Sequence, residues 1–176
     1  MADMCPITVE ELRSRFEYEA SSGRLTWRRR DEHSYQHVRW NTKYAGKVVG
    51  VLDKAGYRVV RFNGRTIKAH RVVWALTHGA WPDAYVDHID CDRSNNRISN
   101  LRLATPLQSS QNQRTPKTNK SGFKGVCWNA AASKWQAGIC CRRRKIHLGL
   151  FSTPEEAAAA YAKAAERFHG DFARTE

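Results

Sequence analysis

The most informative absence in this 176-residue sequence is that of acidic side chains from one long segment of its second half. From Arg93 to Pro154, 62 consecutive residues contain no Asp or Glu, although they include 12 Lys and Arg. A surface that serves only solubility mixes both signs of charge. The whole chain also carries a net charge of +13. Together they predict a surface that binds phosphates, with nucleic acid as the leading partner and an anionic membrane surface as the second.

Three further absences narrow the class of protein. No stretch approaches the roughly 18 apolar residues of a membrane span. The N-terminus, MADMCPITVEEL, lacks the basic and then apolar segments of a secretory signal. The five cysteines are odd in number and include no C-x-x-C pair, which disfavours disulfides and a structural zinc site. We therefore expect a cytoplasmic protein with reduced thiols and no attachment to a membrane.

Caps, turns and hydrophobic spacing predict the elements of the N-terminal part. Thr8 followed by Glu11 indicates a capping box, and Asn63-Gly64 is typical of the two-residue type I′ turn of a hairpin. The expected elements are a helix over 8–20, a strand over 23–29, a hairpin over 57–70, a helix over 71–79, strands over 85–89 and 101–104, and a short helix from Thr105-Pro106.

The basic, proline-containing stretch QRTPKTNKS at 113–121 indicates a linker. After it we expect three short strands at about 124–128, 134–141 and 144–150. A helix then begins with Thr153 as its N-cap and Glu156 completing a capping box. One stripe of this helix would cover the sheet, namely Ala157, Tyr161, Ala164 and Phe168. The predicted fold class is α+β.

Residues 85–112 combine a strand, a loop, a strand and a helix with side chains suited to metal-assisted chemistry. Asp87 offers a carboxylate, and His88 beside it is a candidate general base toward water. Gln108, Ser109 and Asn112 offer oxygens that suit Mg²⁺. A hairpin followed by a helix would gather these groups into one concavity. The competing interpretation is a polar turn, because each residue alone is ordinary loop chemistry.

The run VDHID…NNRISNLRLAT resembles the HNH nuclease motif of phage and intron-encoded homing endonucleases, which have a ββα-metal core. The preceding segment, from His70, also resembles those proteins, and we interpret His70 as a packing or hydrogen-bonding residue rather than a ligand. The resemblance implies that Asp87 ligates the metal and that His88 is the general base. It implies that Asn100 pins the loop and orients the histidine.

One position departs from the family pattern. The third motif residue, a His or Asn that completes the metal site, falls at Ser109. Asn112, one turn later on the same helix face, or Gln108 could substitute for it. Alternatively, Ser109 binds weakly through a water, or the site has lost its metal affinity. The expected cofactor is a divalent metal, Mg²⁺ or else Mn²⁺, and a zinc thiolate at Cys91 is not expected.

The segment 121–173 resembles the DNA-binding domain of plant Apetala and ethylene-response-factor proteins. The resemblance lies in GFKGV at 122–126, LGLFST at 148–153 and EEAAAAY at 155–161. It implies a three-stranded antiparallel sheet packed on one helix, with the sheet entering the major groove. The candidate DNA-binding residues are Arg97, Arg102, Arg114, Lys117, Lys120, Lys124, Trp128, Lys134, Gln136, Arg142 and Arg144.

The sequence thus predicts two functional parts. Residues 1–113 contain an HNH core at about 70–113, residues 114–121 form a basic linker, and residues 122–176 form the DNA-binding domain. The leading hypothesis is a metal-dependent endonuclease that nicks double-stranded DNA in a bacterial or phage-infected cell. The alternative is a catalytically impaired DNA-binding or regulatory protein, and RNA binding is a third hypothesis. The pattern does not indicate whether the protein is a monomer or a dimer.

Overall fold

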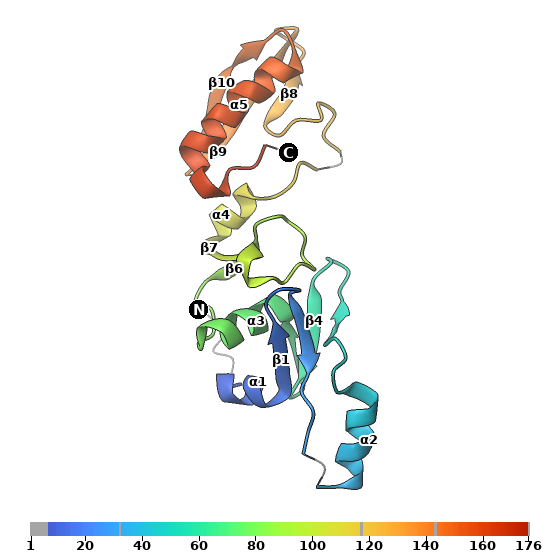
Figure 1. The fold of residues 1–176 in the computed structure, drawn as a ribbon. Coiled ribbons are helices and arrows are strands. Elements are labelled where there is room, and N and C mark those ends of the chain that lie inside the picture. Colours follow the sequence, from blue (N-terminus) through green and yellow to red (C-terminus); the bar gives the residue numbers. More distant parts are fainter. Residues whose placement is uncertain (1–6, 32, 117, 143, 176) are drawn as a thin grey trace. The chain divides into compact units, whose positions relative to one another are not determined.

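The computed structural model describes residues 7–31, 33–116, 118–142 and 144–175 (Figure 1). It is a mixed structure of helices and small antiparallel sheets, as the predicted α+β class requires. The chain divides into two compact units, one up to Ala104 and one from Thr105. The second unit therefore begins before the predicted linker. The predicted domain limits at 113 and 122 remain a prediction.

The first helix, α1 (Val9–Arg15), has the predicted capping box, in which Thr8 and Glu11 exchange side-chain and backbone hydrogen bonds. The prediction that it continues to residue 20 is wrong. The chain instead enters β1 (Phe16–Glu19), which pairs with β2 (Arg24–Trp27). The reason is visible in the alternation Phe-Glu-Tyr-Glu, which places apolar side chains on one face of a strand.

Besides β1, a helix and a short strand of the first unit were not predicted. Helix α2 (Tyr35–Tyr44) begins after Ser34, whose side chain accepts a hydrogen bond from the His37 N–H. The short strand β3 (Val51–Leu52) pairs with β4 (Arg58–Phe62) at the edge of a three-stranded sheet. A mainly polar helix and a two-residue strand carry little hydrophobic periodicity, so the sequence pattern does not reveal them.

The predicted hairpin is confirmed as β4 and β5 (Arg65–Lys68), whose turn residues Asn63 and Gly64 have φ values of 48° and 74°. Helix α3 (Ala69–His78) follows immediately and ends at Gly79, where φ is 75°. Its inner face buries Val72, Val73 and Ala75. The residues of this core come mainly from α1, from α3 and from the three small sheets of the first unit.

Strands β6 (Tyr85–His88) and β7 (Leu101–Ala104) form a separate two-stranded sheet, joined by a loop that ends in the short 3₁₀ helix η1 (Ile98–Asn100). In their register Asp87 lies opposite Arg102 and His88 opposite Leu101. This pairing fixes both polar residues at the end of β6, and the His88 ring contacts His70 at the start of α3. Asp87 and His88 therefore lie on a regular, buried strand.

The second unit opens with α4 (Pro106–Gln111), the short helix predicted from Thr105-Pro106, and Thr105 and Gln108 form a capping box at its start. The predicted sheet is confirmed as β8 (Val126–Asn129), β9 (Lys134–Cys141) and β10 (Arg144–Phe151). Helix α5 (Pro154–His169) covers one face of it, followed by η2 (Gly170–Phe172). At Gly125, φ is 71° and a Cβ atom would lie 2.1 Å from the Tyr161 ring, so only glycine permits this approach.

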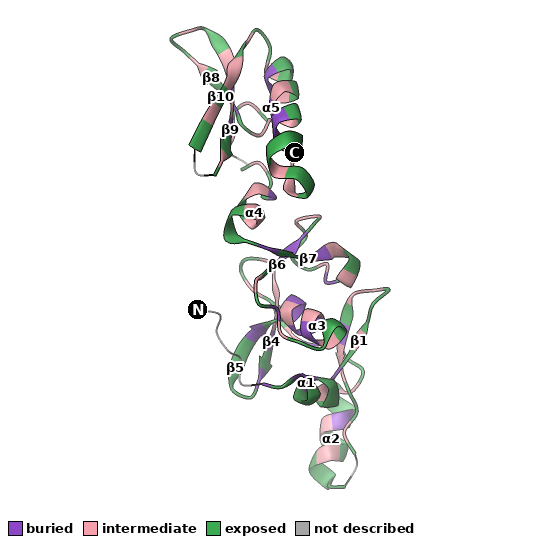
Figure 2. Ribbon diagram, turned by 90° about the vertical axis from the view of Figure 1, so that its left-hand side faces the viewer, coloured by how far each residue is buried: buried purple, intermediate pink, exposed green. Residues whose placement is uncertain are grey.

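The inner stripe of α5 is confirmed in part. Ala157, Tyr161 and Ala164 are buried, and Figure 2 shows buried positions along this helix beside exposed ones. Phe168, predicted to continue the stripe, is 37% exposed. Ala165 takes the last inward position instead, and the Phe168 ring lies beside the Arg167 guanidinium. The sheet is thus covered mainly by small side chains and one tyrosine.

Candidate functional site

His88, the last residue of β6, is buried with its Nε2 atom 3.1 Å from the side-chain oxygen of Asn96. An amide oxygen only accepts hydrogen bonds, so Nε2 carries the proton and Nδ1 keeps the lone pair. Burial lowers the pKa of His88, while the bond to Asn96 and the nearby carboxylates oppose this shift. The imidazole is therefore neutral near pH 7 and suited to accept a proton from water.

Two aromatic rings fix the plane of the His88 ring. The His70 ring lies edge-on to it, with centroids 4.9 Å apart and an interplanar angle of 85°. The Tyr57 ring contacts both histidines, at centroid distances of 5.4 Å to His70 and 5.9 Å to His88. His70 is itself buried, and its Nδ1 atom has no hydrogen-bond partner among the described residues. Burial, with smaller effects from His88, Lys68 and Arg71, lowers the pKa of His70 to about 3.

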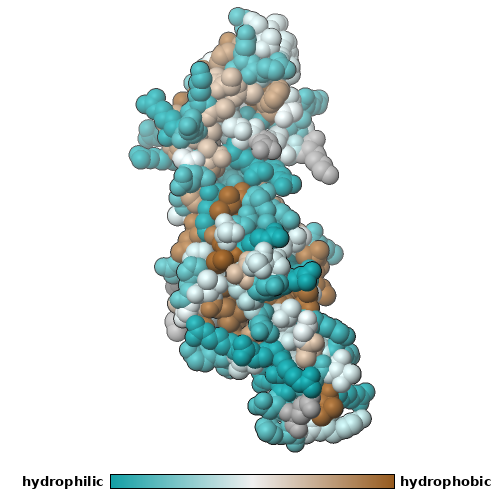
Figure 3. Space-filling view, in the orientation of Figure 1, coloured by the Kyte–Doolittle hydropathy of each residue, from teal (hydrophilic) through white to brown (hydrophobic). Residues whose placement is uncertain are grey.

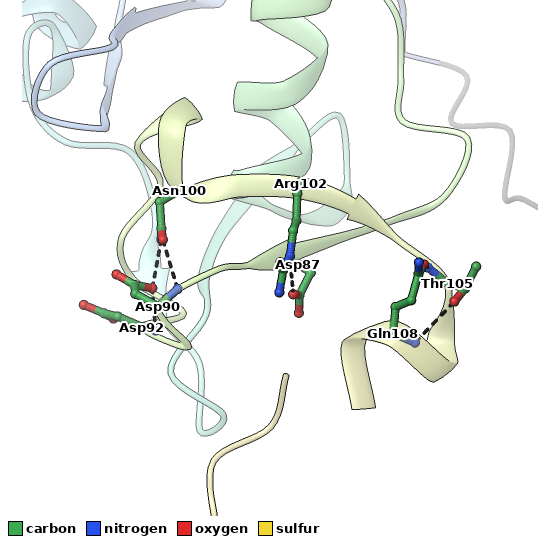
Figure 4. A network of polar contacts seen from close by, with 7 residues as sticks. All are labelled: Asp87, Asp90, Asp92, Asn100, Arg102, Thr105 and Gln108. Carbon is green, nitrogen blue, oxygen red and sulfur yellow. Dashed lines mark hydrogen bonds and ion pairs between the residues drawn. The ribbon is translucent and has the colours of Figure 1, made fainter. Parts of the chain in front are cut away.

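Asn100 closes the loop that follows β6 (Figure 4). Its side-chain nitrogen donates to Asp90 Oδ1 and to the Asn95 carbonyl, both at 2.9 Å. Its oxygen accepts from the Asp90 N–H at 3.1 Å. Burial raises the pKa of Asp90, but hydrogen bonds from Asn95, Asn100 and the Asp92 N–H outweigh it, so the pKa lies below its usual value. The hydrogen bond that His88 Nε2 donates is accepted by Asn96 and not by Asn100, and Asn96 was not among the predicted site residues.

A tyrosine from the unpredicted strand β1 holds the same loop from its other side. The Tyr18 hydroxyl accepts a hydrogen bond from the Ile98 N–H at 2.8 Å and donates to the Asn96 carbonyl at 3.1 Å. Arg97 adds a third tie, because its Nε atom donates to the Ser21 carbonyl at 2.9 Å. Sequence reasoning missed Tyr18 and Tyr57. The alternation around Tyr18 was the available signal for the strand.

Asp87 is buried on β6, where its Oδ2 atom lies 3.2 Å from Arg102 Nε (Figure 4). Arg102, a predicted DNA contact, thus pairs with the predicted metal ligand, and its contact with DNA remains a prediction. The described residues contain no group of three or more His, Cys, Asp or Glu side chains that could hold an ion. A cation at Asp87 would therefore complete its shell with amide, hydroxyl, water or phosphate oxygens.

The candidates for the third motif position lie in α4, in the second unit. Ser109 is half-buried in the helix, and Asn112 is buried at its C-cap. The Gln108 side-chain oxygen accepts a hydrogen bond from the Thr105 N–H at 2.8 Å, so it serves the helix cap. This commitment disfavours Gln108 as a ligand. The choice between Ser109 and Asn112 remains a prediction.

The C-terminal sheet has one face under α5 and one exposed face. Val126, Ala137 and Ile139 pack toward the helix, so the alternate residues Lys134 and Gln136 lie on the exposed face. Lys145 and His147, opposite Cys140 and Gly138, share that face and were not predicted. The register thus assembles a polar surface with two lysines.

The strand register separates the C-terminal candidates into different groups. Trp128 has the strand parity of Val126, not of Lys134, and its ring lies edge-on to Trp135 at 5.2 Å between centroids. The Lys124 ammonium donates to the Gln111 and Gln113 carbonyls at 2.6 and 2.7 Å, so it ties the linker to the sheet. The remaining candidates are exposed, namely Arg114, Lys120, Arg142 and Arg144. Lys117 lies outside the described residues.

In the described part of the chain, no helix is long and apolar enough to cross a membrane. Residues 68–111 match the family described as HNH endonuclease. This match includes Asp87, His88, Asn100 and Ser109.

Comparison with known proteins adds viral relatives. The chain is 35% identical over 108 residues to Protein 3.8 of Escherichia phage T7, an alignment that covers 61% of this chain and 88% of the phage protein. It is 41% identical over 125 residues to the uncharacterized HNH endonuclease L560 of Acanthamoeba polyphaga mimivirus, covering 69% of this chain and 63% of that protein.

A weaker similarity is found with a plant protein. The chain is 31% identical over 65 residues to APETALA2-like protein 2 of Oryza sativa, covering 37% of this chain and 15% of the rice protein. No solved structure gives a significant match.

Proposed function

We propose that this chain, which belongs to the HNH endonuclease family, is a metal-dependent enzyme that nicks one strand of double-stranded DNA. The observation that carries this proposal is the state of His88. It is a buried, neutral imidazole whose proton is fixed on Nε2 by Asn96. It stands next to a buried carboxylate, Asp87, within the residues that match the family.

The chemistry follows from these residues. His88 Nδ1 accepts a proton from the attacking water, whose oxygen forms a bond to phosphorus while the bond to the leaving sugar oxygen breaks. Asn96, Tyr57 and His70 hold the imidazole ring in one orientation. Asn100 keeps the loop closed beside it. One such site acts on one strand at a time, so a nick is the expected product.

The carboxylate of Asp87 fits a hard divalent cation, because such ions prefer oxygen ligands, and the Arg102 guanidinium competes with the ion for that carboxylate. HNH nucleases generally use a divalent metal, and we assign Mg²⁺, with Mn²⁺ as a substitute. When bound, the ion stabilises negative charge on the phosphate and the leaving oxygen. Asp87 would hold it, and from motif order Ser109 or Asn112 is the further ligand.

The proposal is tested by incubating supercoiled plasmid with the full chain and Mg²⁺ or Mn²⁺. We expect open circles from the wild type and a loss of roughly 100-fold or more in rate for His88→Ala. His33→Ala, which removes an exposed histidine, is the matched control and should cut normally. Absence of nicking by the wild type, or equal nicking by His88→Ala, would contradict the proposal.

A catalytically impaired DNA-binding or regulatory protein is the second candidate function, favoured by serine at position 109. Ser109→Asn distinguishes the two. A large gain in nicking would show that the native site is impaired. Unchanged nicking would show that Ser109 or Asn112 already acts as the further metal ligand. An inactive chain that binds DNA in both forms would support the second candidate.

We further propose that the C-terminal domain, residues 122–176 after the linker 114–121, directs the enzyme to DNA. The exposed sheet face with Lys134, Gln136 and Lys145 supports this assignment, as does the weak similarity to the rice protein. Lysine suits phosphate contacts, and glutamine can contact a base edge. The phage relative supports a phage-infected bacterial cell as the place of action.

A further inference from the structure

The first unit contains a basic segment to which the proposed function gives no role. Between β2 and β3, residues 28–47 run from three consecutive arginines through α2 to Lys47, and we name this segment the α2 arm. It contains six Lys and Arg against two acids, Asp31 and Glu32. Figure 1 shows α2 at one end of its unit, apart from the β6–β7 hairpin. Its charge therefore needs an explanation separate from the site at His88.

The α2 arm is anchored firmly to its unit. Asn41 is buried. Its side-chain amide makes two hydrogen bonds with the Arg30 backbone, accepting from the N–H at 2.9 Å and donating to the carbonyl at 2.8 Å. The Trp40 ring lies edge-on to Trp27, with centroids 5.6 Å apart. Trp27 in turn packs against the core residue Phe16 at 4.9 Å. These contacts fix which side of α2 faces the unit.

The opposite side of α2 is basic and exposed. Tyr35, Arg39 and Lys43 follow one another at intervals of four residues, so they form one stripe on the helix. All three are exposed, and Tyr35 is exposed to 79%. Arg28 and Arg29 precede the helix and are also exposed. Figure 3 shows hydrophilic side chains over this end of the unit, with a small hydrophobic patch among them.

Like charges are crowded at the base of the arm. The Arg30 guanidinium stacks on the Trp40 ring, 3.9 Å from its centroid. Burial, and next the positive charge of Arg15, lower the pKa of Arg30. Concentrating like charges costs free energy in the isolated protein, and a polyanion removes that cost. Exposed cations interleaved with tyrosine, on a helix about 15 Å long, suit a nucleic-acid backbone.

We propose that the α2 arm is a second DNA-binding surface, located in the nuclease unit, that contacts the sugar–phosphate backbone of duplex DNA through Arg39 and Lys43, with Arg28 and Arg29 beside them. The choice of DNA rests on the proposed function. Contacts to phosphates position a duplex without reading its sequence. The arm would thus hold the substrate in the nuclease unit independently of the C-terminal sheet.

The test is the salt dependence of binding, measured with the full chain and a labelled 30-base-pair duplex by fluorescence anisotropy without divalent metal. Each phosphate contact contributes about 0.9 to the slope of log K against log salt, so Arg39→Gln/Lys43→Gln should lower the slope by about 1.8. Affinity near physiological salt should fall at least tenfold. Lys163→Gln/Arg167→Gln, on the exposed side of α5, is the matched control and should keep the wild-type slope.

Further readings separate this proposal from the proposed function. At saturating DNA the arm variant should nick at the wild-type kcat with a raised KM. If the wild type binds DNA but does not nick it, the nuclease proposal fails, and the salt slope of binding still tests whether the α2 arm contacts DNA. If the arm variant is folded, as judged by a wild-type circular dichroism spectrum, and its salt slope is unchanged, the proposal that the α2 arm binds DNA is wrong. The proposal is also wrong if an RNA duplex of equal length binds the wild type as tightly as DNA and loses the same affinity in the arm variant.

Discussion

At the residue scale, a single amide decides which nitrogen of His88 carries the proton. Asn96 presents only its oxygen to Nε2, and both side chains are buried, so the alternative tautomer would leave two acceptors facing each other. The edge-on ring of His70, whose pKa is lowered to about 3, places a neutral neighbour beside this imidazole. The proposed base is therefore held in one tautomer before any substrate binds.

His70 should make the protein less stable in acid. Its pKa is about 3 in the folded chain and near 6.5 when unfolded. Above pH 6.5 both states are neutral, and below it only the unfolded state takes up the proton. Between about pH 7 and pH 4, His70 should therefore remove about 3 kcal/mol from the free energy of unfolding.

Urea unfolding across this pH range checks the prediction for His70. His70→Gln does not titrate, so its stability should fall less steeply with acid, by about the amount that His70 contributes. His33→Gln removes an exposed histidine and should retain the wild-type slope. Parallel curves for the wild type and His70→Gln would mean that His70 is not held neutral by the fold.

The pair of Asp87 and Arg102 predicts a link between metal and stability. Arg102→Gln leaves a buried carboxylate without its cation, which should cost about 3 kcal/mol. A divalent ion should then recover more stability in the variant than in the wild type, because the competing positive charge is gone. Urea unfolding with and without saturating Mn²⁺ measures this, with Arg61→Gln on the exposed side of β4 as control. Equal metal stabilisation of all three proteins would count against Asp87 as the ligand.

At the element scale, the hairpin β1–β2 supports the loop that carries Asn96. Tyr18→Phe removes one hydroxyl that bonds both Asn96 and Ile98, which should cost about 1–2 kcal/mol. We expect a lower midpoint in urea and a lower kcat with little change in KM. Tyr85→Phe, at an exposed position on β6, is the matched control. A normal kcat in Tyr18→Phe would show that the loop keeps its position without this support.

The elements that the sequence predicts well are those with local chemical signals. The capping boxes at Thr8, Thr105 and Thr153 and the turn at Asn63-Gly64 all form, because each depends on a few adjacent residues. Helix α1 was predicted too long because cap signals fix only where a helix begins. The polar helix α2 is held by Asn41 and by stacking on Trp40, contacts that no periodicity encodes.

The same distinction applies to the candidate site. Motif order identified Asp87, His88 and Asn100, which the structure places within one hairpin. It could not identify Tyr18 and Tyr57, because their contacts with the site join segments far apart in sequence, or Asn96, because its contact depends on how the loop after β6 folds. Strand parity likewise separated Trp128 from Lys134 only once the register was known. Such long-range pairings are products of the fold.

At the scale of the whole molecule, positive charge belongs to both units. Residues up to 104 contain 18 Lys and Arg against 12 Asp and Glu, and the rest contain 12 against 5. Neither unit alone accounts for the attraction to a polyanion. A nuclease unit with its own backbone contacts would remain on DNA while the C-terminal sheet binds elsewhere on the same duplex. This arrangement requires both surfaces to release counterions in a single binding event.

Combining neutralised variants of both surfaces tests this requirement. Arg39→Gln/Lys43→Gln should lower the salt slope by about 1.8, and Lys134→Gln/Lys145→Gln on the exposed sheet face should lower it by a similar amount. Since the two pairs lie in different units, their losses should add to about 3.6 in the fourfold variant. If the duplex occupied only one surface at a time, the fourfold variant would instead lose little more slope than the stronger pair alone.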